Sequence, residues 1–162
     1  MVVVPYDPAW VAAFEAERAR MAKTLFPIAL GIEHIGSTSV PGLCAKPVID
    51  LLVGTLSLED ADRCVPLLVA EGWDFSADFN ATLVGRRFLR RLQGGVRTHH
   101  VHIVVFDGEL WEGYLRFRDK LREQPELARE YETLKRDLAV KFRDERERYT
   151  ASKTDFVKRV LE

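Results

Sequence analysis

The sequence predicts an α+β fold, with a mixed β-sheet that has helices packed mainly on one face and is followed by a helical C-terminal part. The predicted strands all lie before residue 107, and every element predicted after it is helical. The segment 86–106 has the alternation and central Gly-Gly of a β-hairpin. With 162 residues, 47% of them apolar and 30% charged, the chain is expected to form one domain, residues 1–162.

The first predicted elements are a helix and a strand. Asp7 is a favourable N-cap and Pro8 suits the first helical position. Pro27 ends this helix, and Gly31 leads into a strand that reaches Gly36. The apolar face of the helix consists of Trp10, Phe14, Met21 and Leu25.

The middle of the chain predicts a buried strand and a second helix. The run 47–53 has the length and β-branching of a strand covered on both faces. Ser57 is expected to cap a helix from Leu58 to Ala70, which Gly72 ends. The helices after the hairpin are predicted from three apolar stripes: Leu110, Tyr114, Phe117 and Leu121; Leu127, Tyr131, Leu134, Leu138 and Phe142; and Phe156, Val157, Val160 and Leu161.

The turn after the first strand carries the clearest chemical pattern. Gly36 permits a backbone conformation that a residue with a Cβ resists, and three hydroxyls follow, from Ser37, Thr38 and Ser39. Asp50 lies in the buried strand, where a carboxylate is costly unless it is paired, hydrogen-bonded or bound to a metal. The spacing predicts a phosphate-sized cradle facing a carboxylate, although Asp50 holding a loop through backbone N–H groups is the alternative.

Two histidines are candidates for the same site. His100 and His102 alternate with apolar residues, so both project from one face of their strand. An imidazole can bind a divalent metal or a phosphate. Half-buried histidines bonded to backbone carbonyls are an equally acceptable interpretation, and the sequence leaves both open.

Basic residues surround this predicted site. Between residues 79 and 106 there are five arginines, three histidines and no acidic residue, which favours an anion-binding face over a merely charged edge strand. Arg86 and Arg90 share one strand face, while Arg87 and Arg91 share the other, so only one pair can line the site. Lys46 is placed where its ammonium could reach a phosphate above the turn, although a solvated loop lysine is the alternative.

These motifs resemble a known superfamily. Gly36-Ser37 followed by Asp50 is similar to the signature of the nucleotidyltransferase-fold superfamily, and the string 34–43 with 46–50 resembles the GrpB family within it. The resemblance extends over nearly the whole chain and implies a nucleotidyltransferase-like mixed β-sheet. Other matching segments are Tyr6-Asp7, Trp10, Phe14, His100-Val101-His102, Phe117-Arg118-Asp119, Tyr131, Leu134-Lys135, Tyr149-Thr150 and Lys153.

The resemblance implies a small-molecule nucleotide or phosphorylated ligand and a divalent metal, Mg²⁺ or Mn²⁺. Asp50 would be the catalytic carboxylate, and Asp50, His100 and His102 the metal ligands. A metal held partly by imidazole would favour Mn²⁺ over Mg²⁺. The ligand's phosphates would contact Gly36, Ser37, Thr38, Ser39, Lys46, Arg86 and Arg90.

The chain departs from the superfamily pattern at Leu52, where a second acid is expected two residues after Asp50. Three functions therefore stay open: a metal-dependent nucleotidyltransferase, a non-catalytic ligand-binding or regulatory module, and a protein-interaction domain. GrpB-like domains fused to dephospho-coenzyme A kinases suggest a link to coenzyme A metabolism. Lys135 and Lys153 match GrpB-like sequences, but their pattern alone predicts exposed helix lysines.

The composition and the beginning of the chain limit which partners and which cellular location are expected. A net charge of −1 gives no overall reason to expect nucleic acid or a membrane. The beginning of the chain has neither a positive segment nor a long apolar run, so no export or membrane insertion is expected. Two cysteines, Cys44 and Cys64, predict reduced thiols and a cytoplasmic location. The oligomeric state is left open.

Overall fold

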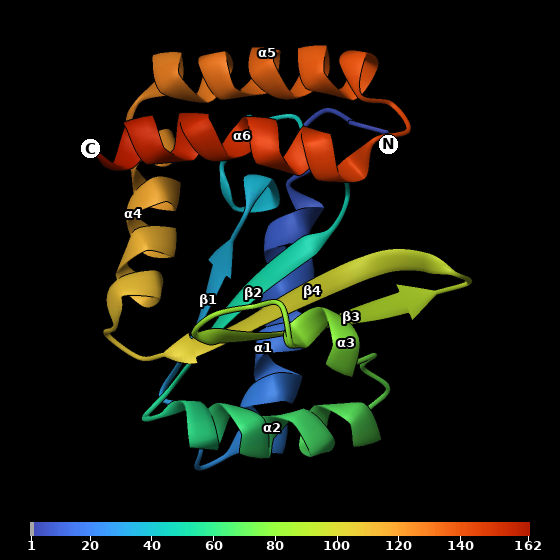
Figure 1. The fold of residues 1–162 in the computed structure, drawn as a ribbon, viewed down its shortest axis with the longest axis vertical. Helices are drawn as coiled ribbons and strands as arrows, with labels where there is room; N and C mark the ends of the chain where they lie inside the picture. Colours follow the sequence, from blue (N-terminus) through green and yellow to red (C-terminus); the bar gives the residue numbers. More distant parts are fainter. Residues whose placement is uncertain (1) are drawn as a thin grey trace.

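The computed structural model describes residues 2–162 and contains a four-stranded sheet in the order β1-β2-β4-β3 (Figure 1). The central pair, β2 and β4, is parallel, and the two outer pairs are antiparallel. The strands are β1 (Gly31–Ile35), β2 (Ile49–Thr55), β3 (Arg86–Gln93) and β4 (Val96–Val105). The helices are α1 (Ala9–Leu25), α2 (Leu58–Ala70), α3 (Ala77–Asn80), α4 (Glu109–Glu123), α5 (Pro125–Lys141) and α6 (Arg146–Leu161), with a short 3₁₀ helix η1 (Ser37–Ser39).

Local sequence signals place most of these elements as predicted. Helix α2 has the expected bounds, and the Ser57 hydroxyl accepts a hydrogen bond from Asp60 N at 3.1 Å. The hairpin of β3 and β4 forms with a register shift after Arg91. The α+β class with a mixed sheet is therefore confirmed.

Helices α1 and α2 cover one face of the sheet with the largest apolar cluster. Apolar side chains that alternate along the strands face these helices and are almost fully buried, among them Leu51, Val53, Leu89, Val101 and Ile103. Their burial fixes which side chains face the opposite way. Asp50, Leu52, His100 and His102 consequently lie on the second face.

The second face is covered in part by α4, so the helices are shared between two faces more evenly than the sequence predicts. Trp111 of α4 packs with Ile35, Leu52 and Val104 in a second apolar cluster. Helices α5 and α6 lie side by side at one end of the sheet (Figure 1). A third apolar cluster contains side chains of α5 and α6 together with Val40 and Leu43. The segment after η1 therefore packs against these two helices.

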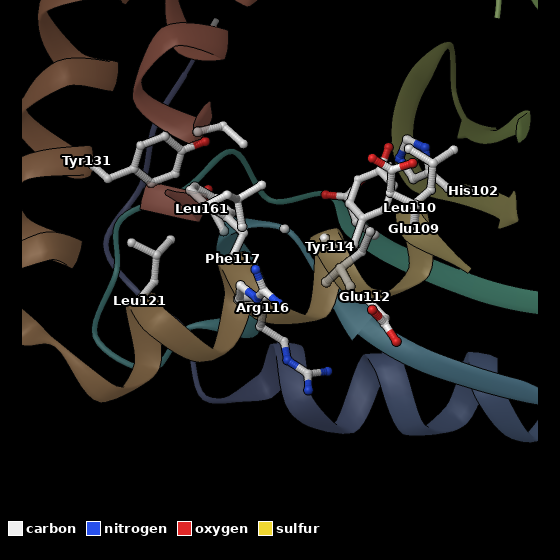
Figure 2. A pocket seen from close by; sticks show the side chains of 17 residues that line it. His102, Glu109, Leu110, Glu112, Tyr114, Arg116, Phe117, Leu121, Tyr131 and Leu161 are labelled. Carbon is white, nitrogen blue, oxygen red and sulfur yellow. Dashed lines mark ion pairs between the residues drawn. The ribbon is translucent and has the colours of Figure 1, made fainter. Parts of the chain in front are cut away.

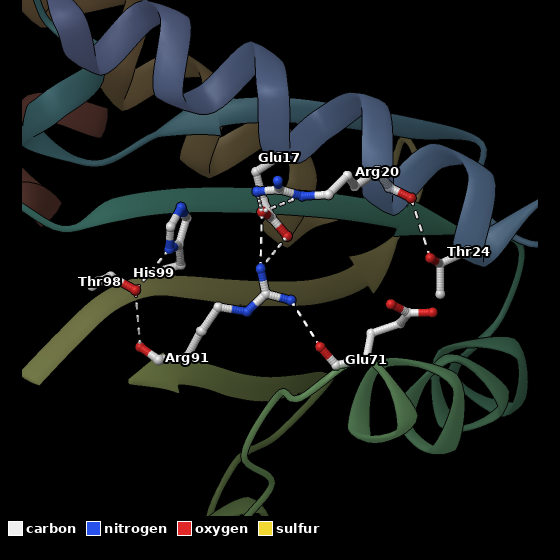
Figure 3. A network of polar contacts seen from close by, with 7 residues as sticks. All are labelled: Glu17, Arg20, Thr24, Glu71, Arg91, Thr98 and His99. Atoms are coloured by element: carbon white, nitrogen blue, oxygen red, sulfur yellow. Dashed lines mark hydrogen bonds and ion pairs between the residues drawn. The ribbon is translucent and has the colours of Figure 1, made fainter. Parts of the chain in front are cut away.

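Three of the four arginines of β3 pair with acidic residues that lie outside the hairpin. Arg91 donates two 3.0 Å hydrogen bonds to Glu17 of α1, whose side chain is 2% exposed (Figure 3). Arg87 pairs with Asp62 of α2, and Arg90 pairs with Asp74. Acidic residues outside the hairpin compensate the charges of these three arginines, which argues against the expected anion-binding face at their positions.

Two further features concern the chain as a whole. No helix within residues 2–162 is long and apolar enough to cross a lipid bilayer. Cys44 and Cys64 are both free thiols and both buried.

Candidate functional site

The turn after β1 lies directly against the carboxylate of Asp50. Gly36 has φ +77°, a left-handed conformation that favours glycine. A Cβ added at Gly36 would lie 3.0 Å from both Cβ and Cγ of Asp50 and closer still to Oδ2. The close approach of turn and carboxylate therefore requires glycine at this position.

Two of the three hydroxyls of the turn are used internally. Thr38 Oγ1 donates to Val48 O (3.1 Å) and lies 3.0 Å from His34 Nε2. Ser39 Oγ donates to Gly36 O at 2.5 Å, and the side chain is buried. These two side chains hold the shape of the turn, and neither is placed to offer its hydroxyl proton to a ligand.

Ser37 contacts a residue that the sequence pattern places on an exposed helix face. Lys135 of α5 donates from Nζ to Ser37 Oγ (2.7 Å) and to the Cys44 carbonyl (2.9 Å). It is 4% exposed, because α5 packs over the segment that follows η1. Burial, with Lys153 next in effect, lowers the pKa of Lys135 to about 8.

Asp50 forms a carboxylate–imidazole pair with His100. The register sets the two residues side by side, and His100 Nδ1 lies 3.2 Å from Asp50 Oδ1. Burial by itself would raise the pKa of Asp50, but the hydrogen bond from His100 and the nearby His102 imidazole outweigh burial and lower the pKa below its usual range. An ionised carboxylate only accepts, so Nδ1 carries the proton. His100 Nε2 is buried and has no hydrogen-bond partner among residues 2–162.

The Nδ1 atom of His102 faces a hydrogen-bond donor. Arg86 Nη1 lies 2.8 Å from His102 Nδ1 and 3.2 Å from the Tyr114 hydroxyl. A guanidinium only donates, so His102 Nδ1 accepts and its proton is on Nε2, which lies 3.9 Å from Asp50 Oδ1. Burial, followed by the nearby Arg86 charge, lowers the pKa of His102 despite the opposing effect of Asp50, which keeps the ring neutral. The role of Arg86 in this geometry is to fix the protonation of His102.

The expected metal ligands do not fit a shared metal ion in this arrangement. His102 turns a proton toward Asp50, and His100 already uses Nδ1 on the same carboxylate oxygen. Leu52, where a second acid would complete the pattern, is fully buried against Trp111. Among residues 2–162 no group of three His, Cys, Asp or Glu side chains is placed to hold a metal. The geometry therefore supports no reaction step through a metal.

Two clefts meet at Ser37 and Asp50. The smaller, of about 190 Å³, is polar and is also lined by Lys46, His100 and Lys135, together with Thr38, Tyr149 and Lys153. It brings residues from the turn, two central strands and the last two helices into one site. The sequence signals for Lys135 and Lys153 are weak, because only their matches to a known family set these residues apart from other helix lysines.

The larger cleft, of about 670 Å³, runs along α4 and is mostly apolar (Figure 2). His102 lies at one end and Tyr131 at the other, with Tyr114 and Phe117 of α4 between them. Gly36, Ser37 and Asp50 also line it, so it opens on the same carboxylate as the polar cleft. An organic group bound here would have aromatic surfaces to pack against.

Arg90 does not join either cleft. Its side chain pairs with Asp74 at 2.7 Å and lines a separate cavity of about 640 Å³. Of the two arginines expected on the site face, only Arg86 reaches the site, and it does so through His102. The prediction of Arg90 as a direct ligand contact is therefore not supported by the geometry.

Comparison with known proteins identifies the family. The family model described as GrpB protein matches residues 1–162. The chain belongs to the GrpB family. A crystal structure of the conserved protein GrpB from Enterococcus faecalis superposes with a TM-score of 0.85 and 40% identity, over 99% of this chain and 97% of that one.

Two curated relatives are similar over most of this chain. The UPF0157 protein PA4798 of Pseudomonas aeruginosa (strain PAO1) is 40% identical over 98% of the chain, and the UPF0157 protein YqkA of Bacillus subtilis (strain 168) is 34% identical over 96%. This GrpB chain spans 65% and 45% of their lengths. A partial match, 38% identical over 74 residues, links 44% of the chain to 18% of a dephospho-CoA kinase of Mycolicibacterium paratuberculosis.

Proposed function

We propose that this GrpB chain binds a nucleotide or another phosphorylated small molecule, with the phosphate in the polar cleft and the organic part in the apolar cleft. The observation that supports this most directly is the junction of the two clefts at Ser37 and Asp50. A cationic subsite beside an aromatic one matches a molecule that is anionic at one end and planar or apolar at the other.

The charges of the polar cleft favour an anion. Lys46, Lys135 and Lys153 come from three separate elements and converge on the cleft that Ser37 also lines. Lysine ammonium groups and a serine hydroxyl are common partners of phosphate oxygens. Among the described residues that line the cleft only Asp50 is acidic, and its carboxylate accepts a hydrogen bond from His100.

The same geometry favours binding without metal-dependent transfer. Leu52 removes the second carboxylate, and the proton on His102 Nε2 faces the position that a cation would take beside Asp50. The partial match to a dephospho-CoA kinase makes coenzyme A and its precursors a ligand class worth including beside nucleotides. Nucleotidyl transfer remains the second candidate, and it requires Asp50.

Thermal denaturation with and without ligand tests the proposal. Millimolar nucleoside triphosphates, coenzyme A and dephospho-coenzyme A are compared with adenosine, which lacks phosphate. At a hundredfold excess over Kd a ligand adds about 2.7 kcal/mol of stability, which raises Tm by roughly 5–10 °C in a domain of this size. Lys46→Met is expected to abolish most of the shift, whereas Lys23→Met, an exposed lysine of α1, should leave it unchanged. If none of the phosphorylated compounds raises Tm, the proposal is wrong.

Asp50→Asn separates metal-free binding from metal-dependent binding. Without a metal, Asp50 repels a bound phosphate, so the substitution should keep or strengthen affinity measured by calorimetry. With Mg²⁺ or Mn²⁺ bridging Asp50 and the ligand, the same substitution should weaken affinity, and turnover of a triphosphate should disappear with it. The sign of the change therefore decides between the two candidates.

A further inference from the structure

Ser37 and Lys135 form a contact that phosphate binding alone does not require. Ser37 Oγ and Lys135 Nζ are 2.7 Å apart, and Lys135 also donates to the Cys44 carbonyl at 2.9 Å. The lysine is 4% exposed, whereas Ser37 is partly exposed and lines both clefts. The buried amine of Lys135 thus forms a hydrogen bond with the Ser37 hydroxyl, which a ligand in either cleft can reach.

The two contacts of Lys135 can be kept when the ammonium group loses a proton. An unprotonated amine has two N–H donors and one lone pair. As an ammonium group Lys135 donates to both Ser37 Oγ and the Cys44 carbonyl. After losing one proton it can keep the bond to Cys44, and its lone pair can then accept the proton of Ser37 across the same 2.7 Å. Serine becomes a useful nucleophile when such a base lies within hydrogen-bond reach.

We propose that Ser37 and Lys135 are a nucleophile–base pair that transfers a phosphorus group from a phosphoric ester or anhydride through a covalent serine intermediate. The proposal rests on the proposed phosphate site for its substrate class. It differs from direct metal-assisted transfer because the reacting hydroxyl belongs to the protein.

The step balances within the site. Ser37 Oγ attacks phosphorus as its proton passes to Lys135 Nζ, and the bond from phosphorus to the leaving oxygen breaks. Lys135 then returns that proton to the leaving oxygen. An acceptor hydroxyl or water next attacks phosphorus with Lys135 as base, the Oγ–phosphorus bond breaks, and the proton returns to Ser37.

The surroundings of Lys135 bring its basicity close to neutral pH. Burial acts most strongly, followed by Lys153 of α6, and Lys46 adds a smaller effect in the same direction. Glu132 and Cys44 act the other way. Lys135 Nζ also lies over the Tyr131 ring, 5.0 Å from the ring centroid.

Diisopropyl phosphofluoridate is a suitable probe, because this phosphorus electrophile labels activated hydroxyl groups and releases fluoride. The expected result is one adduct per chain, mapped to Ser37 by peptide mass spectrometry and absent in Ser37→Ala. The labelling rate should rise with pH and level off above about 8.

Two lysine variants test whether Lys135 acts as a base or only through its positive charge. Lys135→Arg keeps the positive charge but offers no lone pair, and it should slow labelling roughly 100-fold. Lys141→Arg, an exposed lysine of the same helix, should label at the wild-type rate. Circular dichroism establishes that each variant is folded.

The inference is overturned if the wild-type chain is not labelled, if the label is on another residue, or if folded Lys135→Arg reacts at the wild-type rate. Its failure is distinct from failure of the proposed function. Nucleotide-induced thermal shifts of the wild-type chain test phosphate binding independently of labelling, so a wild-type chain that binds nucleotides but is not labelled overturns this inference alone.

Discussion

At the scale of single residues, Gly36 controls how closely the turn approaches Asp50. Gly36→Ala forces a Cβ against the Asp50 side chain as well as into a left-handed backbone conformation. Gly42 is the matched control, because it has φ +84° but no atom of residues 2–162 beyond its chain neighbours lies within 4 Å of an added Cβ.

We predict that Gly42→Ala lowers the free energy of unfolding by about 1–2 kcal/mol, the cost of the backbone conformation alone. Gly36→Ala should cost clearly more and should also remove ligand-induced thermal shifts, because Asp50 must leave His100 to make room. Urea denaturation of both variants measures the difference. Equal destabilisation by the two substitutions would show that the contact with Asp50 is unimportant.

Lys135 makes a pH-dependent contribution to stability. The pKa of Lys135 is about 8 in the folded chain, whereas an unperturbed lysine, as in the unfolded chain, has a pKa of 10.5. Between pH 8 and 10.5 the unfolded chain therefore binds more protons than the folded chain. Stability from this residue therefore rises between pH 8 and 10.5, by about 3 kcal/mol in total, and is flat below pH 8. The difference in unfolding free energy between wild type and Lys135→Met, measured by urea denaturation from pH 7 to 10, should show this rise. A difference that does not change with pH would mean that Lys135 has an ordinary pKa.

At the scale of elements, β3 uses its arginines mainly to attach neighbouring elements to the sheet. Arg91 links β3 to α1 through Glu17, and its guanidinium lies 4.7 Å from the Trp73 ring centroid. Figure 3 shows the contacts between Arg91 and Glu17, whose carboxylate also contacts Arg20. Arg90, by contrast, forms a pair with Asp74 in which both side chains are at least one-third exposed.

We predict that Arg91→Met destabilises the fold by about 3–5 kcal/mol, because it leaves the buried Glu17 carboxylate with one partner. The matched substitution Arg90→Met removes a solvent-screened pair and should cost about 0–1 kcal/mol. Chemical denaturation of both variants tests the contrast. Similar losses would contradict a structural role specific to Arg91.

At the scale of the whole molecule, the candidate site is assembled from two distant parts of the chain. The turn and the strands supply Ser37, Asp50 and His100, and α5 and α6 supply Lys135 and Lys153. A ligand in the polar cleft would therefore join the sheet to the C-terminal helices.

We predict that a bound triphosphate slows amide hydrogen exchange in α5 and α6 roughly tenfold, because it opposes the local opening of these helices away from the turn. Helix α2 lies on the opposite face of the sheet and should show little local change, which makes it the internal control. Hydrogen-exchange mass spectrometry with and without ligand gives the comparison. If exchange slows only in α2, or in neither α5 nor α6, the ligand binds elsewhere.

The sequence by itself determined the features that depend on short-range periodicity. Alternation along a strand has a period of two, so His100 and His102 necessarily share a face, and burial of the opposite face turns them toward Asp50. A glycine before a hydroxyl-rich segment likewise predicted the turn at Gly36, whose φ is positive.

Only the tertiary structure decided which charged groups meet. Lys135 is 98 residues from Ser37 in the chain, and no local pattern distinguishes it from an exposed helix lysine until α5 packs over the turn. The acids that pair with Arg90 and Arg91 likewise come from separate elements. A lysine, an arginine or an acidic side chain can be exposed to solvent or buried in an ion pair. Which of the two occurs depends on contacts between distant segments and not on the neighbouring residues in the sequence.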